Sequence, residues 1–314
     1  HDALPISTDG FHLEFCERDD DGQLSLPIRA KPVPTHLGHV SAPRWWPSLQ
    51  AMVRWGIFSV ASDLSIDRSY SPYFETPKTA STTRSIVHAI AANATTPPPR
   101  HVALITPKMV LHILAFFPKP FVAALDARHQ FHSVSQNGDP RTMQWFSVAC
   151  RDPDAGPDAK PVVFEANRLV MGWKGSTSRA QSLSWVCATH YHCSGTDPFT
   201  FHAFASDAET PPPYVAVKDR TGVTKAIIFV LYDNVGHVCG DEATRLALTQ
   251  RYTSNAAQMK VTIKVSKKHR AALANNPVGT HPGIELFNGA GCAFLGFAFR
   301  ITDTHIFSQH ADVN

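Results

Sequence analysis

Short apolar, β-branched runs along the chain predict strands, and two of these runs end on an aspartate. The run from Phe121 to Leu125 is followed directly by Asp126, and the run from Lys225 to Leu231 leads into Asp233. A lone aspartate after a strand is more often a turn residue or a helix cap. Two such strands, however, can deliver two carboxylates into one cleft, which is what two-metal phosphoryl transfer requires.

Other patterns predict the elements around these strands. Apolar residues at helical spacing predict a helix over 109–117, and further helices are expected over 176–193, after Gly175, and over 242–259. Strands are expected near 260–265 and over 291–299. Residues 78–93 combine a threonine-rich, hairpin-like start with an apolar stretch. Polar, proline-rich stretches predict a hairpin tip at 152–160 and a long loop over about 193–224. The segment 41–70 is aromatic and apolar, and a buried tryptophan cluster is expected there.

Composition places the chain among ordinary globular proteins and limits its partners. Its 314 residues allow one large domain or two modest ones, and 43% hydrophobic with 18% charged residues supports a sizeable core. The formal charge is only +3, so contacts with nucleic acid would need a local basic groove. No apolar run approaches the length of a membrane span, so no membrane association is expected.

The six cysteines indicate reduced thiols. They show no C-x-x-C pair and no even spacing, which favours an intracellular protein of the cytoplasm or nucleus over a disulfide scaffold. The His and Cys residues between Cys187 and His202 lack the spacing of a structural zinc finger, so no zinc site is expected. Residues 1–6 are similar to the translated tail of a sequencing adapter and are excluded from fold reasoning.

Three motifs, in this order, resemble motifs A, B and C of reverse transcriptases. Asp126 with Phe131 resembles motif A, and the segment Met171-Gly-Trp-Lys-Gly-Ser-Thr177 followed by Gln181 resembles motif B. The segment Tyr232-Asp-Asn234 resembles motif C. The three motifs follow one another in the same order as in the family, and this shared order carries the resemblance.

Two further motifs extend the resemblance over residues 78 to 300. Arg84 and Asn93, which flank Ile86-Val87, resemble the family's fingers motif, and Phe294-Leu-Gly296 resembles the motif that opens the thumb. The resemblance implies an α+β right-hand polymerase, in which an antiparallel palm sheet is flanked by helices and the thumb is incomplete. The implied regions are an irregular leader (1–40), a fingers-like region (41–120), a palm with finger insertions (121–290) and the start of a thumb or connection (291–314).

The implied activity is that of an RNA-directed DNA polymerase, a nucleotidyltransferase that adds dNTPs to a primer 3′ end. Its cofactor would be Mg²⁺ or Mn²⁺, and its partners would be an RNA or DNA template–primer and dNTPs. Asp126 and Asp233 would bind the metal with the backbone carbonyl of Ala127, and Asn234 would complete the catalytic set. The chain is expected to be part of a retrotransposon polyprotein whose RNase H, integrase or recombinase domains lie outside this sequence.

The resemblance also implies substrate-binding residues. Arg84 would clamp the triphosphate, because a guanidinium forms fork-like bonds to phosphate oxygens, and Lys78 would assist it. Phe131 would exclude the 2′-hydroxyl of ribonucleotides. The remaining substrate-binding candidates come from motif B and are Met171, Gly172, Trp173 and Gln181. The glycines of this motif would let the backbone pass close to the nucleotide, and Lys174 is expected to be an exposed loop lysine.

Asn234 is the main departure from the family pattern, in which motif C usually ends in two aspartates. An amide brings no charge to offset a divalent ion, so metal affinity should fall. One alternative is therefore a catalytically decayed, reverse-transcriptase-like module that binds nucleic acid. Another is a viral RNA-dependent RNA polymerase, but such enzymes usually carry a second aspartate where this chain has Phe131.

Overall fold

The computed structural model describes residues 40–62, 64, 68–95, 102–134, 146–156, 158–191, 193, 195–203 and 213–263, with six short strand segments outside these ranges. The six segments are 17–18, 24–25, 285–287, 292–294, 297–301 and 306–310. The chain forms two compact units, each discontinuous in sequence. Unit 1 comprises 1–99 and 131–177, and unit 2 comprises 100–130 and 178–314.

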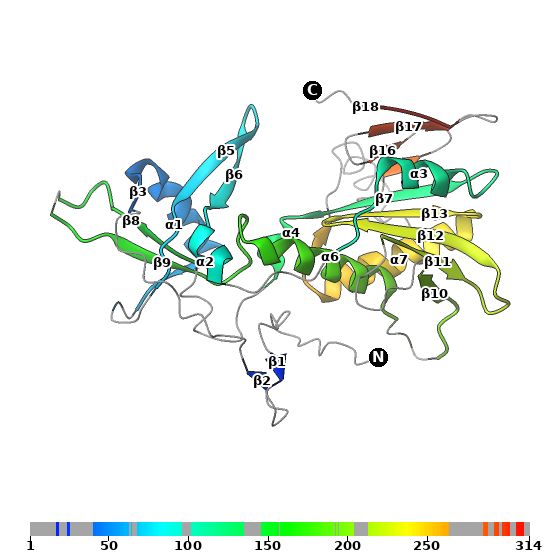
Figure 1. Cartoon of the computed structure of the whole chain (residues 1–314), viewed down its shortest axis with the longest axis horizontal. Helices are drawn as coiled ribbons and strands as arrows, with labels where there is room; N and C mark the ends of the chain where they lie inside the picture. Colours follow the sequence, from blue (N-terminus) through cyan, green and yellow to red (C-terminus); the bar gives the residue numbers. More distant parts are fainter. Residues whose placement is uncertain are drawn as a thin grey trace, which may run out of the picture. The chain divides into compact units, whose positions relative to one another are not determined.

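Unit 1 contains a four-stranded sheet and a separate β-hairpin (Figure 1). The sheet has the order β3 (Val40–Ser41), β8 (Ser147–Cys150), β9 (Val162–Ala166), β4 (Phe58–Val60). The hairpin joins β5 (Tyr73–Thr79) to β6 (Thr82–Val87), and the helices are α1 (Trp46–Arg54) and α2 (Ile90–Thr95). The predicted hairpin tip at 152–160 is confirmed, because it connects the antiparallel strands β8 and β9.

The predicted tryptophan cluster in this unit is only partly formed. Trp46 packs edge-on against Phe164 with ring centroids 5.6 Å apart, and Trp45 lies 6.3 Å from Tyr73. Trp55, in contrast, is 71% exposed. It follows the last residue of α1, so its side chain is not covered by the helix that buries Leu49 and Met52.

Unit 2 is built on a seven-stranded antiparallel sheet. Its strands are β10 (Thr200–Ala203), β11 (Tyr214–Lys218), β12 (Thr224–Leu231), β13 (Asn234–Cys239) and β7 (Phe121–Arg128), in that order, with β14 (Thr262–Ile263) and β15 (Glu285–Phe287) both paired to β7. The two predicted strands are β7 and β12, although β7 continues past Asp126 to Arg128 and so carries this aspartate within the strand. The loop predicted over 193–224 is wrong in part, because it contains β10 and β11.

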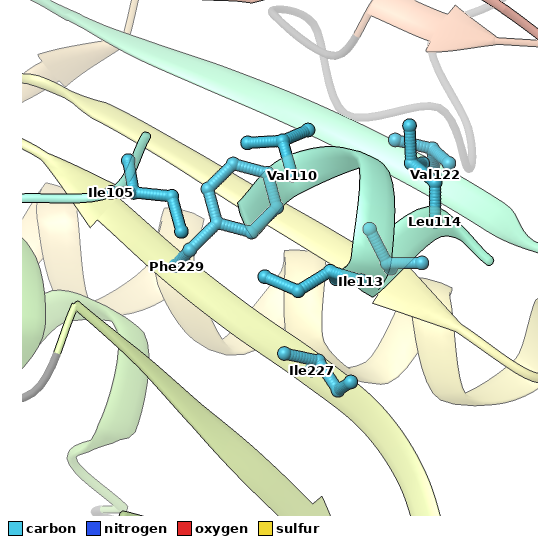
Figure 2. Close-up of a cluster of buried hydrophobic side chains, with 8 residues drawn as sticks. Ile105, Val110, Ile113, Leu114, Val122, Ile227 and Phe229 are labelled. Carbon is cyan, nitrogen blue, oxygen red and sulfur yellow. The ribbon is translucent and has the colours of Figure 1, made fainter. Parts of the chain in front are cut away.

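Helix α3 (Pro107–Leu114) covers one face of this sheet (Figure 2). The side chain of Thr106 caps the helix by accepting a hydrogen bond from the Met109 amide, and Pro107 suits the first turn. The apolar side of the helix packs on alternate residues of three strands, which point to the same face. This core cluster comprises Ile105, Val110, Ile113, Leu114, Val122, Ile227, Phe229 and Val238.

Gly236 allows tight packing on this face of the sheet, because the absence of a side chain leaves room for the Phe229 ring. It pairs with Phe229 across β12 and β13, and a Cβ at Gly236 would lie 2.2 Å from that ring. An aromatic residue over a cross-strand glycine fills the space that the glycine leaves. The pair therefore keeps the core cluster packed at the centre of the sheet.

Helix α7 (Glu242–Gln258) packs on β13, β7, β12 and β14. Its N-cap Asp241 accepts a 2.7 Å hydrogen bond from the Thr244 amide, and this bond lowers the pKa of the Asp241 carboxyl. The helix predicted over 242–259, with acids suited to its first turn, is thus confirmed. It faces the residues of β13 that alternate with those under α3, among them His237, whose ring lies 6.4 Å from that of Tyr252.

The apolar stretch predicted as one strand over 291–299 forms two strands. β16 (Cys292–Phe294) and β17 (Phe297–Ile301) pair antiparallel, and β18 (Ile306–His310) pairs with β17. Phe294 pairs with Phe297, so the chain reverses between them. Leu295 and Gly296 of the thumb motif lie outside the described residues.

Two sequence expectations concern the environment of the chain. Within the described residues, no helix is long and apolar enough to cross a membrane. Cys150, Cys187, Cys193 and Cys239 are free thiols.

We predict that His237 makes stability depend on pH. Burial, and then the nearby Arg245 charge, lower the pKa of His237 from its ordinary 6.5 to about 3. Between these values the unfolded chain binds a proton that the folded chain does not, so stability falls by about 1.4 kcal/mol for each unit that the pH drops below 6.5. Above pH 6.5 this contribution is constant.

The measurement is chemical unfolding from pH 7.5 to 4.5 of the protein, of His237→Leu and of a control, His112→Leu, at an exposed position of α3. The pH slope should be shallower in His237→Leu and unchanged in His112→Leu. Parallel slopes for all three proteins would show that His237 is not the titrating group.

Candidate active site

The pairing of β13 with β7 brings the aspartates of the two predicted motifs together in unit 2. Asn234 is the partner of Asp126 in this pairing, and the Ala127 amide donates a 2.8 Å hydrogen bond to the Asp233 carbonyl. Asp126 and Asn234 thus form a non-hydrogen-bonded pair, in which side chains are closer than in the alternate pairs. Asp233 directly precedes this pair, in the two-residue turn between β12 and β13.

Burial decreases toward this end of the sheet, on the face that α3 covers. On β7, Val122 is 4% exposed and lies in the core cluster, whereas Asp126, four residues on, is half-buried. On β13, Val238 is fully buried and Asn234 is half-buried. The cover by α3 therefore ends before Asp126 and Asn234, and these polar side chains lie where the apolar packing ends.

Both aspartates also act on a neighbouring tyrosine of α7. Burial is the main cause that raises the pKa of Tyr252, and the charges of Asp126 and Asp233 raise it further.

The side chain of Asn234 is oriented by its neighbour. Its amide donates a 3.1 Å hydrogen bond to Oδ1 of Asp233. A second aspartate at this position would repel the first, because two carboxylates at this distance are both negative. The asparagine therefore stabilises the Asp233 carboxylate in the absence of a cation.

The donor set at this end suits magnesium. Asp126 and Asp233 supply hard carboxylate oxygens, and Mg²⁺ is commonly held by one or two carboxylates together with waters and substrate phosphates. Among the described residues, no three His, Cys, Asp or Glu side chains form a metal-binding group. A site enclosed by three or more such side chains is thus not found there.

Gln181, an expected substrate-binding residue, is 1% exposed. Its side chain is hydrogen-bonded to the backbone of the β12–β13 hairpin, which carries Asp233. Its Nε2 donates to the Val230 carbonyl at 2.8 Å, and its Oε1 accepts from the Tyr232 amide at 2.5 Å. Both ends of the amide are therefore used within unit 2.

The loop that resembles motif B is held by Asn93 in unit 1. The Asn93 side chain donates to the Gly172 carbonyl at 2.9 Å and accepts from the Lys174 amide at 2.8 Å. Lys174 also donates from Nζ to the Asn93 carbonyl and is half-buried, which differs from the exposed loop lysine expected from the sequence. Asn93 thus connects the fingers motif to the motif B loop.

Gly172 is required in this loop by the backbone of β6. Its φ is +117°, a region that favours glycine, and a Cβ would lie 2.0 Å from the Val87 carbonyl oxygen. The Val87 amide also donates to the Met171 carbonyl at 3.0 Å. The resemblance to motif B implies a close approach of the nucleotide at this glycine, and the structure adds a close approach within the protein itself.

Trp173 lies in the interior of unit 1. It is 4% exposed, and its ring packs edge-on against Phe146 with centroids 5.5 Å apart. This placement favours a packing role for the side chain. Phe131, in contrast, is half-buried in the short helix α4 (Gln130–Ser133).

Arg84 and Lys78 lie exposed on the β5–β6 hairpin. Arg84 is paired with Thr76, and Lys78 occupies the register shift between Pro77 and Thr79. A bulge of this kind redirects a side chain. Among the described residues, neither Arg84 nor Lys78 forms a salt bridge. A surface ion pair would be the simplest structural role for Arg84, and it is not found there.

Sequence reasoning missed Gln130 and Ser184, two buried polar residues beside the turn. Ser184 donates to the Tyr232 carbonyl at 2.6 Å, and Gln130 donates to Ser184 Oγ at 2.7 Å. The only sequence signal was the spacing of Gln181 and Ser184, which places them one turn apart on a helix.

We predict that Gly172→Ala destabilises unit 1. The added methyl group would collide with the Val87 carbonyl and strain a left-handed backbone, at a cost of at least about 2 kcal/mol. The matched control is Gly156→Ala, where a Cβ would meet nothing within 4 Å. Thermal unfolding followed by circular dichroism should show a lower melting temperature for Gly172→Ala only, and equal melting temperatures would contradict the close approach.

Comparison with known proteins gives a likeness in fold. No protein-family model matches the sequence, and no curated protein does. Among solved structures, the chain is similar to a foamy viral protease–reverse transcriptase that was solved in complex with double-stranded DNA. The TM-score is 0.52 at 14% sequence identity, over 88% of this chain and 37% of the viral one. The chain thus spans little more than a third of that protein, and its mixed α and β fold is similar to part of a retroviral reverse transcriptase.

Proposed function

We propose that this chain is the fingers and palm of an RNA-directed DNA polymerase, which adds dNTPs to a primer 3′ end. The observation that carries the proposal is the β7–β13 pairing, which brings the aspartates of two motifs 107 residues apart to one end of a half-open sheet face. In this proposal the seven-stranded sheet of unit 2 is the palm. The likeness in fold supports it.

Asp126 and Asp233 would hold Mg²⁺ or Mn²⁺, with the Ala127 carbonyl as an additional ligand. When bound, two such ions supply positive charge beside the attacking and leaving oxygens of phosphoryl transfer. The chain itself contributes position and orientation. The Ala127–Asp233 hydrogen bond fixes the separation of the two backbones, and the Asn234 amide orients the Asp233 carboxylate.

Arg84 and Lys78 would bind phosphate groups of the incoming nucleotide. Both are exposed cations on one hairpin, and in such a place Arg84 can form two parallel hydrogen bonds to phosphate oxygens. Phe131 would select deoxynucleotides by occupying the space that a 2′-hydroxyl needs. The backbone of Met171 and Gly172 would line the nucleotide and template side, because the Trp173 ring is used in packing.

The second candidate function is a decayed module that binds a template–primer and does not polymerise. Asn234 favours it, because an amide lowers the negative charge available to a divalent cation. If the chain is an active polymerase, Asp126 and Asp233 provide most of the metal binding and Asn234 only adjusts the metal affinity. The two candidates differ in what a restored aspartate would do.

We predict that Asp126→Asn and Asp233→Asn each abolish primer extension. Loss of either carboxylate should lower the rate by at least about a hundredfold, since a charged ligand is replaced by a neutral one. The assay is extension of oligo(dT) on poly(rA), in Mg²⁺ and separately in Mn²⁺. The control is Asp158→Asn, at an exposed position of the β8–β9 loop. Equal extension by the two site variants and the control would overturn the site assignment.

Asn234→Asp separates the two candidate functions. If the chain is a working variant, it extends primers as it stands, and the restored carboxylate should change the rate by less than about tenfold while lowering the Mg²⁺ concentration required. If the chain is decayed, extension should rise from background. Binding of a fluorescent template–primer, measured in parallel, should be unchanged in either case.

A further inference from the structure

The turn that carries Asp233 is held from one side by helix α6 (Lys174–Thr189). β11 begins at Tyr214, whose partner on β12 is Phe229, so β12 runs past the end of its neighbouring strand. The Gln181 amide takes the place of that strand, because it bonds the Val230 carbonyl and the Tyr232 amide. These two backbone groups would otherwise lack a strand partner on this side of β12.

Tyr232, in the turn of this hairpin, has a strained backbone conformation. Its φ is +53°, in the left-handed region that non-glycine residues rarely adopt. Gln181 accepts from its amide, and Ser184 donates to its carbonyl. Strained residues persist where the surrounding structure determines them strongly, and here two side chains of α6 hold both backbone polar groups of Tyr232.

Gln130 links the hydrogen bonds around Tyr232 to β7, the strand that carries Asp126. It lies four residues after Asp126, and its Nε2 donates to Ser184 Oγ at 2.7 Å and to the Ala180 carbonyl at 3.0 Å. The Ser184 hydroxyl therefore accepts from Gln130 and donates to Tyr232, and it joins the end of β7 to the β12–β13 turn.

The three side chains of this network are fully buried. Gln130 is 2% exposed, Gln181 1% and Ser184 0%. Gln181 and Ser184 also bond backbone groups of the β12–β13 hairpin, so these two side chains have little capacity to bind a substrate directly. Buried hydrogen bonds are also the costly ones to break, because each broken bond leaves a desolvated polar group.

We propose that Gln181 and Ser184, tied to β7 by Gln130, are positioning residues that hold the Tyr232–Asp233 turn in its strained conformation and so keep Asp233 beside Asp126. The catalytic consequence rests on the proposed function, whereas the positioning itself does not. Gln181 is thereby moved from the substrate-binding set, where the motif placed it, to a structural role behind the carboxylates.

The first test measures the turn itself. Hydrogen–deuterium exchange of the peptide that contains Tyr232 should be about tenfold faster in Gln181→Leu and in Ser184→Ala than in the unmodified protein. The matched controls are Gln250→Leu, exposed on α7, and Ser182→Ala, whose hydroxyl donates to Ser178 within α6. Unchanged exchange in Gln181→Leu, in a protein that stays folded, would overturn the proposal.

The second test uses the strain as a specific readout. If the network holds a left-handed residue, Tyr232→Gly should restore part of what Gln181→Leu loses, because glycine adopts this φ without cost. The readouts are exchange at the turn and the affinity for Mn²⁺ measured by electron paramagnetic resonance. If the double variant Gln181→Leu with Tyr232→Gly shows only the sum of the two single changes in exchange and in Mn²⁺ affinity, Gln181 acts on stability alone.

The third test separates positioning from substrate contact. In steady-state primer extension, Gln181→Leu should lower kcat about tenfold and leave KM for the dNTP within about twofold. A raised KM with unchanged kcat and unchanged exchange would return Gln181 to the substrate-binding set. If the unmodified protein shows no extension, the proposed function fails, and the exchange and Mn²⁺ measurements still decide the positioning role.

Discussion

The antiparallel pairing of β7 with β13 is the constraint on which the candidate site depends. It sets the register that makes Asp126 the partner of Asn234, and it includes the hydrogen bond from the Ala127 amide to the Asp233 carbonyl. A shift of one residue would turn Asp126 toward the face that α7 covers, since side chains alternate along a strand. The apolar packing on both faces therefore protects the register and, with it, the position of the carboxylates.

The two faces of this sheet contribute differently. The face under α3 is closed by the core cluster and by the fit of Phe229 over Gly236, and it opens toward the turn. On the other face α7 buries His237 and Tyr252, and the α6 side chains hold the turn by direct hydrogen bonds. Apolar packing thus keeps the strands in place, and a few buried polar contacts place the turn. Such a division holds the side chains at this end of the sheet in fixed positions.

The elements that the sequence predicted well are those with a strong local signal. The strands β7 and β12 are apolar runs, and α7 begins with acidic residues that suit the start of a helix. β10 and β11 were missed because a proline-rich stretch lies between them, and their pairing with β12 is a long-range contact that no local pattern encodes. Trp173 and Gln181 were placed at the substrate by the resemblance to motif B, and both side chains lie in the interior.

The sequence by itself determined which residues could carry the chemistry and which strands would present them, because strand-forming runs and the aspartates that follow them are properties of short segments. Tertiary structure decided the rest. Which aspartate lies beside which neighbour depends on register, and register depends on the packing of both sheet faces. Gly172 shows the same limit, since a close approach to the nucleotide was expected there and only the fold revealed that the Val87 carbonyl fills the space of its side chain. Buried hydrogen bonds between residues about 50 positions apart, such as Gln181 to Tyr232, arise only when the chain has folded.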